Sequence, residues 1–279
     1  MKVVHGDAVA AEPAVRHRGG NLRARILLEG TPGTPGNFQL SLGETGEDFV
    51  SPRHRHNFEQ YRAVLEGRYD FGRDGCMTAG MVGYFPAGVH YGPQSSASAT
   101  VAAVLQFGGT SGGGYLSGPE VEAGMEALKR VGEFRDGIFR RREGVPGRRN
   151  QDAFEAIWEL VNERRLVYPE SSYASPILVH PDNVAATAID ERSGAAEKNL
   201  GDFPSHRTSM RMLELPEGAS LVLRGRAVFL ALSGAGAVDA NPYRAQTAFY
   251  LEGGETASIE AGAPSRLLRF ELPAFVERG

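Results

Sequence analysis

Cysteine is nearly missing from this sequence, and its scarcity excludes one way of stabilising a fold. Cys76 is the only cysteine in 279 residues, so no disulfide can form within the chain. It stands in the segment GRDGCM, which is typical of a hairpin turn, and we interpret it as a small turn residue. A single thiol suits a reducing compartment, and the first residues lack an apolar core of signal-peptide length. We therefore expect a cytoplasmic protein.

Long apolar runs and an excess of either charge are also missing. No stretch approaches the roughly 18 consecutive apolar residues that a membrane helix requires, so no membrane partner is expected. The chain carries 30 Lys and Arg against 34 Asp and Glu, a net charge of −4. Because nucleic-acid-binding domains are usually strongly basic, we expect no nucleic-acid partner. The one basic run, 139–149, is interpreted as a solvated connector.

Glycine and proline are abundant, and their distribution predicts the fold class. The 36 glycines and 16 prolines are scattered between short segments, which is the pattern of an all-β barrel or sandwich. The segment 22–28, LRARILL, alternates apolar residues with arginine as a half-buried strand does. A length of 279 residues suits two domains of ordinary size.

The segment 51–67, SPRHRHNFEQYRAVLEG, contains the first pattern with chemical meaning. His54 and His56 are two residues apart in a predicted strand, so both imidazoles leave the same face and can converge on one point. Gln60 follows four residues later, and Gly67 closes the run at a turn. Paired imidazoles on one face of a strand are a usual means of binding a divalent transition metal.

The segment 80–94, GMVGYFPAGVHYGPQ, contains a second pattern, in which Gly80 is followed at fixed intervals by a proline, a glycine and Tyr91. Together the two patterns resemble the two signatures of the cupin superfamily. In that superfamily the position of Gln60 is usually Glu and the position of Tyr91 is usually His. His90 lies one residue early, and alternation allows only one of His90 and Tyr91 to face the interior. Spacing favours Tyr91, whereas ligand chemistry favours His90.

Both patterns recur weakly in the last third of the chain. Aligning Gly234 with Gly67 places apolar residues at the three ligand positions, namely Leu221, Leu223 and Ala227. The resemblance then implies two cupin barrels of the double-stranded β-helix (jelly-roll) type, the second without ligands; an unrelated β-sandwich is the alternative for this part. We predict barrels over 1–112 and 171–279, joined by a helical connector over 113–170. Its helices are predicted to begin at Ser117 and Asn150, and Pro169 is predicted to stop the second.

The resemblance implies a mononuclear metal site in the first barrel. The implied ligands are His54, His56, Gln60 and His90, with Tyr91 as the alternative to His90. Fe(II) is the expected metal, and Mn, Ni and Zn are the alternatives. Tyr91 is also a candidate acid or base. Glu59 would take the place of Gln60 if the chain slipped by one residue.

Arg62 is the least expected residue of the pattern. Arg62 lies two residues after Gln60 in the predicted strand, so the two side chains are expected on the same face. Arg62 then projects into the barrel with Gln60; the alternative is that it lies outward on a solvated face. An unpaired guanidinium inside a barrel is very unfavourable, and either Glu66 or an acidic substrate would pair with it. We therefore predict a small acidic or enolisable substrate held between the metal and Arg62, with Arg62 and Tyr91 as candidate catalytic residues.

Three functions follow from the resemblance. The first is a metal-dependent dioxygenase acting on a small organic molecule, the second is a redox-neutral lyase or isomerase, and the third is a non-catalytic small-molecule-binding protein. We also expect a homo-oligomer, most simply a dimer. Exposed sheet edges are often covered by a partner, and the arm at 1–20 has the length to add a strand to one.

Overall fold

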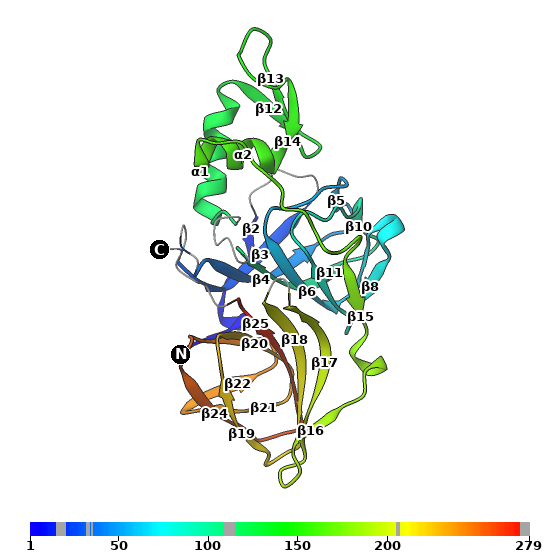
Figure 1. The fold of residues 1–279 in the computed structure, drawn as a ribbon, viewed down its shortest axis with the longest axis vertical. Helices are drawn as coiled ribbons and strands as arrows, with labels where there is room; N and C mark the ends of the chain where they lie inside the picture. The colour runs from blue at the N-terminus through cyan, green and yellow to red at the C-terminus, as the bar shows by residue number, and fades with distance from the viewer. Residues whose placement is uncertain (15–20, 32–33, 35, 109–114, 205–206, 274–279) are drawn as a thin grey trace.

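Two β-barrels lie end to end, and a lobe of helices and short strands covers the far end of the first barrel (Figure 1). The computed structural model describes residues 1–14, 21–31, 34, 36–108, 115–204 and 207–273. In Figure 1 the first barrel runs from blue to cyan, the lobe is green, and the second barrel runs from yellow to red. The predicted all-β fold of two barrels with a helical segment between them is confirmed.

The first barrel consists of two antiparallel sheets. The larger sheet has the strand order β15 (Ile177–Val179), β9 (Val82–Phe85), β6 (Glu59–Glu66), β11 (Thr100–Phe107), β4 (Phe38–Thr45), β3 (Leu22–Glu29) and β2 (Glu12–Pro13). The smaller sheet has the order β5 (Val50–Ser51), β10 (Gln94–Ser96), β7 (Arg68–Asp70) and β8 (Cys76–Thr78). Because side chains alternate along a strand, the larger sheet turns one face to the barrel interior and the other to the second barrel.

The second barrel repeats this plan with a larger and a smaller sheet. The larger sheet has the order β1 (Lys2–His5), β23 (Thr247–Leu251), β20 (Ala227–Ser233), β25 (Ser265–Glu271), β18 (Thr208–Leu215), β17 (Ala195–Phe203) and β16 (Thr187–Asp190). The smaller sheet has the order β19 (Ser220–Arg224), β24 (Thr256–Ala261), β21 (Ala235–Val238) and β22 (Asn241–Arg244). Single turns of 3₁₀ helix lie at Gly6–Ala8, Gly72–Asp74 and Pro181–Asn183.

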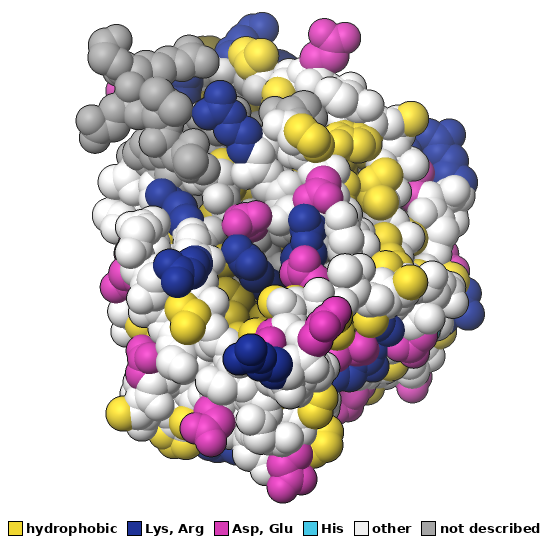
Figure 2. Space-filling model, turned by 60° about the horizontal axis from the view of Figure 1, so that its bottom comes forward, with side chains coloured by type: hydrophobic (Ala, Val, Ile, Leu, Met, Phe, Trp, Pro, Cys, Tyr) yellow, Lys and Arg dark blue, Asp and Glu magenta, His cyan; other side chains and the backbone are white. Residues whose placement is uncertain are grey.

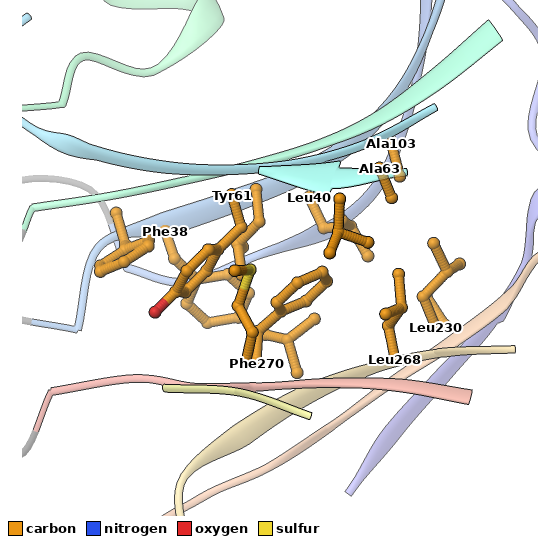
Figure 3. Close-up of a cluster of buried hydrophobic side chains, with 14 of the residues drawn as sticks. Phe38, Leu40, Tyr61, Ala63, Ala103, Leu230, Leu268 and Phe270 are labelled. Atoms are coloured by element: carbon orange, nitrogen blue, oxygen red, sulfur yellow. The ribbon is translucent and has the colours of Figure 1, made fainter. Parts of the chain in front are cut away.

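The larger sheets of the two barrels face each other across a hydrophobic core. Phe38 and Tyr61 project from the first barrel toward Leu268 and Phe270 of the second (Figure 3). The rings of Tyr61 and Phe270 are stacked, with centroids 5.0 Å apart. The Tyr61 hydroxyl lies 2.7 Å from Oγ1 of Thr208, so its polar end is satisfied within the second barrel. The two barrels therefore share one core.

Substitution in this shared core is expected to destabilise the whole chain. Leu268 is 0% exposed, and Leu268→Ala removes packed methyl groups and leaves a cavity. We expect the free energy of unfolding, measured by urea denaturation, to fall by about 2–5 kcal/mol. Val222, on β19, is 58% exposed, and Val222→Ala is expected to change it by less than about 0.5 kcal/mol. Similar losses from both substitutions would contradict a shared core.

Each barrel receives one strand from outside its own part of the chain. β1 pairs with β23 of the second barrel, with Lys2 opposite Tyr250. β15 follows the lobe in sequence and pairs with β9 of the first barrel, with Ile177 opposite Tyr84. The start of the predicted arm thus adds a strand to the chain's own second barrel. The predicted boundaries assign residues 1–112 to the first barrel and 171–279 to the second. In the structure β1 pairs with the second barrel and β15 pairs with the first.

The lobe contains α1 (Gly118–Lys129), α2 (Ala153–Asn162) and a small sheet of β12 (Gly132–Arg135), β13 (Ile138–Arg141) and β14 (Asn150–Asp152). α1 begins after Ser117 as predicted, and Glu120 accepts a hydrogen bond from the Ser117 backbone N–H at 2.7 Å. α2 is capped by Asp152, whose carboxylate accepts from two backbone N–H groups. The predicted cap at Asn150 is wrong because that residue belongs to β14, and α2 ends well before Pro169.

Charges of both signs mix on the surface at the second-barrel end. Figure 2 shows Lys and Arg side chains interleaved with Asp and Glu over the described residues of this face. This arrangement agrees with the balanced composition of 30 basic and 34 acidic residues. Among the residues that the structure describes, the helices are too short and too polar to cross a membrane.

Candidate functional site

The chain between β5 and β6 brings the two histidines into the first barrel. The predicted strand is here a short extended segment, in which His54 forms an isolated antiparallel bridge with Tyr91. The backbone N–H of each donates to the carbonyl oxygen of the other, at 3.1 and 2.9 Å. His54 and His56 are 6% and 8% exposed, and their ring centroids are 4.9 Å apart. The two imidazoles therefore converge.

Tyr91 faces the barrel interior and His90 does not. Tyr91 is 1% exposed, and its hydroxyl oxygen lies 3.0 Å from His54 Nε2. The His90 side chain is exposed. The pKa of its imidazole is lowered, chiefly because the ring is partly desolvated and secondly because the positive charge of Arg55 is near. Because consecutive residues of an extended chain point to opposite sides, the expectation that His90 ligates a metal is corrected. The structure places Tyr91 in the site instead.

The neutral form of His54 has a defined orientation. Its Nδ1 lies 2.6 Å from the carbonyl oxygen of Pro52. Since a carbonyl oxygen only accepts, Nδ1 carries the proton and the Nε2 lone pair points at the Tyr91 hydroxyl. The hydrogen bond from Nδ1 to Pro52 fixes the orientation of the ring, as is usual for a histidine that ligates a metal or accepts a proton through its other nitrogen.

Gln60 and Glu59 lie on opposite faces of β6. The side-chain oxygen of Gln60 lies 3.2 Å from the Tyr91 hydroxyl oxygen, inside the barrel. Glu59 faces the other way, where the Tyr84 hydroxyl donates to its carboxylate. Burial, reinforced by the Glu59 charge, raises the pKa of Tyr84 far above its usual range, so this hydroxyl stays a neutral donor. Glu59 therefore does not take the place of Gln60.

Arg62 projects into the barrel beside these residues and is only 7% exposed. Its Nε and Nη2 donate to Gln60 Oε1 at 3.2 and 2.7 Å. Nη1 donates to Gln94 Oε1 at 2.8 Å, and Nη2 also donates to the Tyr91 hydroxyl oxygen at 2.7 Å. The Phe85 ring centroid lies 4.4 Å from Cζ, which is a cation–π contact. The outward orientation of Arg62 is thereby excluded.

The charge of Arg62 is not neutralised by any carboxylate of the described residues. Glu66, the protein partner considered for it, is exposed at the end of β6. Neutral oxygens of Gln60, Gln94 and Tyr91 meet the guanidinium instead. A buried cation without a counterion is unfavourable, so the site favours an anionic ligand.

A cavity of about 520 Å³ opens from this cluster. Small-molecule sites usually measure about 300–1,000 Å³. Its lining includes the polar cluster of His54, His56, Arg62 and Gln94, further polar residues of β4 and β11 such as Gln39, Ser41 and Gln106, and many apolar side chains. One apolar wall comes from β3 and another comes from the lobe. The lobe therefore completes the site of the first barrel.

Comparison with known proteins yields structural neighbours only. No protein-family model and no curated protein matches the sequence. A protein from Nostoc punctiforme that is provisionally named a dioxygenase matches with a TM-score of 0.62 and 11% identity, over 97% of this chain and 81% of that one. Oxalate decarboxylase from Bacillus subtilis matches with a TM-score of 0.57 and 12% identity, over 99% of this chain and 78% of that one. The chain has the bicupin fold. Identities this low show the fold alone.

The second barrel of this bicupin is filled with apolar side chains. Leu223 and Ala227, which align with His56 and Gln60, are 5% and 0% exposed in one hydrophobic cluster. In the same cluster the rings of Phe229 and Phe249 stack with centroids 4.6 Å apart. The apolar interior expected for this barrel is therefore present.

The first barrel of the bicupin has donors that fit a divalent metal. Among the described residues no group of three or more His, Cys, Asp and Glu is placed to hold a metal, so a site here also needs Tyr91 or Gln60. His54 Nε2 and the Tyr91 oxygen lie 3.0 Å apart and are joined by a hydrogen bond, which a metal bound by both atoms would replace. The Gln60 oxygen already accepts from Arg62, and its role as a ligand stays a prediction.

The second sequence pattern ends at Gln94, which is expected with Tyr61 and Tyr84 to line the mouth of the barrel. Gln94 does line the cavity and accepts a hydrogen bond from Arg62, because its strand pairing places it opposite Ser51. Tyr61 and Tyr84 lie instead in the core between the barrels.

Phe154 of α2 lies outside what the sequence patterns predicted. Its ring centroid is 5.5 Å from that of His56. No sequence signal indicates this contact, because it joins segments that are far apart in sequence.

Proposed function

We propose that this bicupin is an enzyme whose first barrel binds a divalent transition metal through His54, His56 and Tyr91. In this proposal a small organic anion binds against Arg62, and the reaction is that of a dioxygenase. One observation carries the proposal. A buried guanidinium, which no carboxylate of the described residues neutralises, lies beside two imidazoles at the polar end of a cavity.

Charge balance explains why an anion completes the site. A divalent ion near His54 and the guanidinium of Arg62 would repel each other. Two unit charges 4 Å apart interact by about 4 kcal/mol at an effective dielectric constant near 20. An anion placed between them is attracted by both, so the two cations together select a negatively charged ligand.

Arg62 retains a donor for that ligand. Its guanidinium has five N–H groups, and the four hydrogen bonds to Gln60, Gln94 and Tyr91 use four of them. One N–H of Nη1 is left within the described surroundings. The amides hold the guanidinium in place, so little side-chain entropy is lost when a carboxylate binds.

A metal bound here would supply Lewis acidity toward the anion and, as Fe(II), reactivity with O2. The chain's own residues do the rest. Tyr91, whose oxygen lies 2.7 Å from Arg62 Nη2, would release its hydroxyl proton on binding the metal and could transfer a proton as acid or base when it leaves the metal. The ring of Phe58 lies 4.4 Å from that of His56, centroid to centroid, and covers one side of the site against water.

A redox-neutral lyase or isomerase is the second candidate. The hydroxyl of Tyr91 lies 3.0 Å from His54 Nε2 and 2.7 Å from Arg62 Nη2, a geometry suited to proton transfer without O2. The neighbours are named for both chemistries, a dioxygenase and a decarboxylase that has been studied for its Mn(II) centres. Turnover of small carboxylic acids without O2 would support the second candidate, and O2 consumption would support the first.

Loss of the guanidinium tests the anion site. We expect Arg62→Met to weaken the binding of pyruvate to metal-loaded protein by at least about tenfold, measured by isothermal titration calorimetry. The methionine keeps the unbranched stem of the side chain and can pack against Phe85, so the fold is expected to persist.

The control for this substitution is Arg73→Met, which removes an exposed arginine outside the cavity. It is expected to leave pyruvate binding unchanged. Unaltered binding in the Arg62→Met protein would refute the proposed anion site. Metal content is measured on the same samples, so that loss of the anion site can be told apart from loss of the metal.

A further inference from the structure

We infer that the anion taken by this site is a monocarboxylate with a hydrophobic body, such as an arylalkyl acid. The inference rests on the proposed function, since it takes Arg62 as the anion site. It narrows the substrate from any small organic acid to an amphiphilic one, and it assigns the lobe and β3 a part in selecting it.

The size of the cavity is the first argument. It measures about 520 Å³, whereas one water molecule occupies about 30 Å³ of liquid. A carboxylate of one or two carbon atoms would fill only the region near Arg62. The remaining volume would then hold water against the apolar side chains of β3 and the lobe that line the cavity, which is unfavourable. A larger organic body displaces that water.

The distribution of charge is the second argument. Among the described residues that line the cavity, Arg62, Glu12 and Glu29 carry a full charge. Arg62 is 7% exposed, and the two glutamates are exposed. A second carboxylate at the far end of a ligand would meet a negative charge and no described cation. The cavity therefore suits one anionic group at its buried end.

The lobe supplies one apolar wall. Leu116, Val121 and Phe154 come from the lobe or the segment leading into it, and they line the cavity. They belong to one hydrophobic cluster with Phe58, whose ring centroid lies 5.6 Å from that of Phe154. Aromatic side chains at this spacing favour contact with a further ring.

β3 supplies the other apolar wall. Leu22, Ala24 and Ile26 line the cavity, and Ile26 is 38% exposed. The alternating arginine Arg25 points away and forms a salt bridge with Glu44 at 2.6 Å. The half-buried strand predicted from the alternation thus turns its apolar side toward the cavity. Apolar side chains left partly open beside a buried cation suit an amphiphilic ligand.

Three matched probes test the inference on full-length, metal-loaded protein by isothermal titration calorimetry: 3-phenylpropanoate, propanoate and 3-phenylpropan-1-ol. We expect 3-phenylpropanoate to bind at least about tenfold more tightly than propanoate, because the phenyl ring buries apolar surface. It is also expected to bind at least about tenfold more tightly than the alcohol, which lacks the charge. Equal affinities within either pair, or no binding of 3-phenylpropanoate, would overturn the inference.

Substitutions in the two walls locate the effect. Ile26→Ser and Val121→Ser are each expected to weaken 3-phenylpropanoate about 3- to 10-fold and to leave propanoate unchanged. Val222→Ser, at an exposed position of the second barrel, is the matched control and is expected to change neither. If Val121→Ser does not fold, as judged by circular dichroism, the exposed Ile26 position still decides the question. Unchanged 3-phenylpropanoate binding in Ile26→Ser overturns the inference.

Elemental analysis of the same samples separates this inference from the proposed function. Protein without metal that still prefers 3-phenylpropanoate would contradict the metal-dependent enzyme and support the amphiphilic ligand. Protein with metal that binds all three probes equally would contradict the ligand class alone.

Discussion

Replacing both His54 and His56 by alanine is expected to lower bound metal from about one ion per chain to near zero. The two imidazoles supply the nitrogen donors of the site, and their rings converge with centroids 4.9 Å apart. Tyr91 and the amide of Gln60 alone present two neutral oxygens, and both already accept hydrogen bonds from Arg62. Elemental analysis of untagged protein measures the loss.

The control for this double substitution is His90→Ala together with His180→Ala. It also removes two imidazoles, but the His90 side chain is exposed and His180 lies in the segment between the barrels. Bound metal is expected to be unchanged. Full metal content after loss of His54 and His56 would end the case for a metal in the first barrel, and loss of metal in the control would restore His90 as a candidate ligand.

Gln60→Glu is expected to move two affinities in opposite directions. A carboxylate holds a divalent ion more strongly than an amide does, so we expect metal affinity, measured by competition with a chelator, to rise by about tenfold or more. The same carboxylate would form an ion pair with Arg62, whose Nε and Nη2 lie 3.2 and 2.7 Å from the Gln60 oxygen. Pyruvate affinity is therefore expected to fall by about tenfold or more.

Gln106→Glu is the matched control for Gln60→Glu. Gln106 pairs with Gln60 across β6 and β11 and lines the same cavity, but among the described residues Arg62 donates its hydrogen bonds to Gln60, Gln94 and Tyr91 and not to Gln106. Gln106→Glu adds the same charge without placing it in contact with the guanidinium. We therefore expect smaller changes in both the metal affinity and the pyruvate affinity. A rise of both affinities in Gln60→Glu would show that residue 60 does not compete with the ligand for Arg62.

The glycines of the two sequence patterns explain why the fold was predictable. Gly67 has a φ of +78°, and a Cβ there would lie 2.4 Å from the carbonyl oxygen of Ala99. Gly88 has a φ of +81°, and its Cβ would meet the carbonyl oxygen of Pro169 at 2.1 Å. Only glycine fits such turns. Their fixed spacing therefore marked the ends of strands and predicted which parity of β6 faces inward.

The parts of the site that could not be predicted depend on irregular backbone and on distant contacts. The chain around His54 and Tyr91 is held by a single bridge, so alternation alone could not decide between His90 and Tyr91. The place of Phe154 beside His56 follows from the packing of the lobe. Periodicity predicted the helices of that lobe, but it carries no information about the surface on which they pack.

The pairing of β1 with β23 affects how two copies of this chain can associate. A strand edge with unpaired backbone groups readily adds a strand from another molecule. The first residues, Lys2–His5, already lie along that edge of the second barrel and pair with it from Thr247 to Tyr250. A dimer that paired with β23 would have to displace the chain's own first strand, so the start of the chain protects this edge of a domain formed by its end.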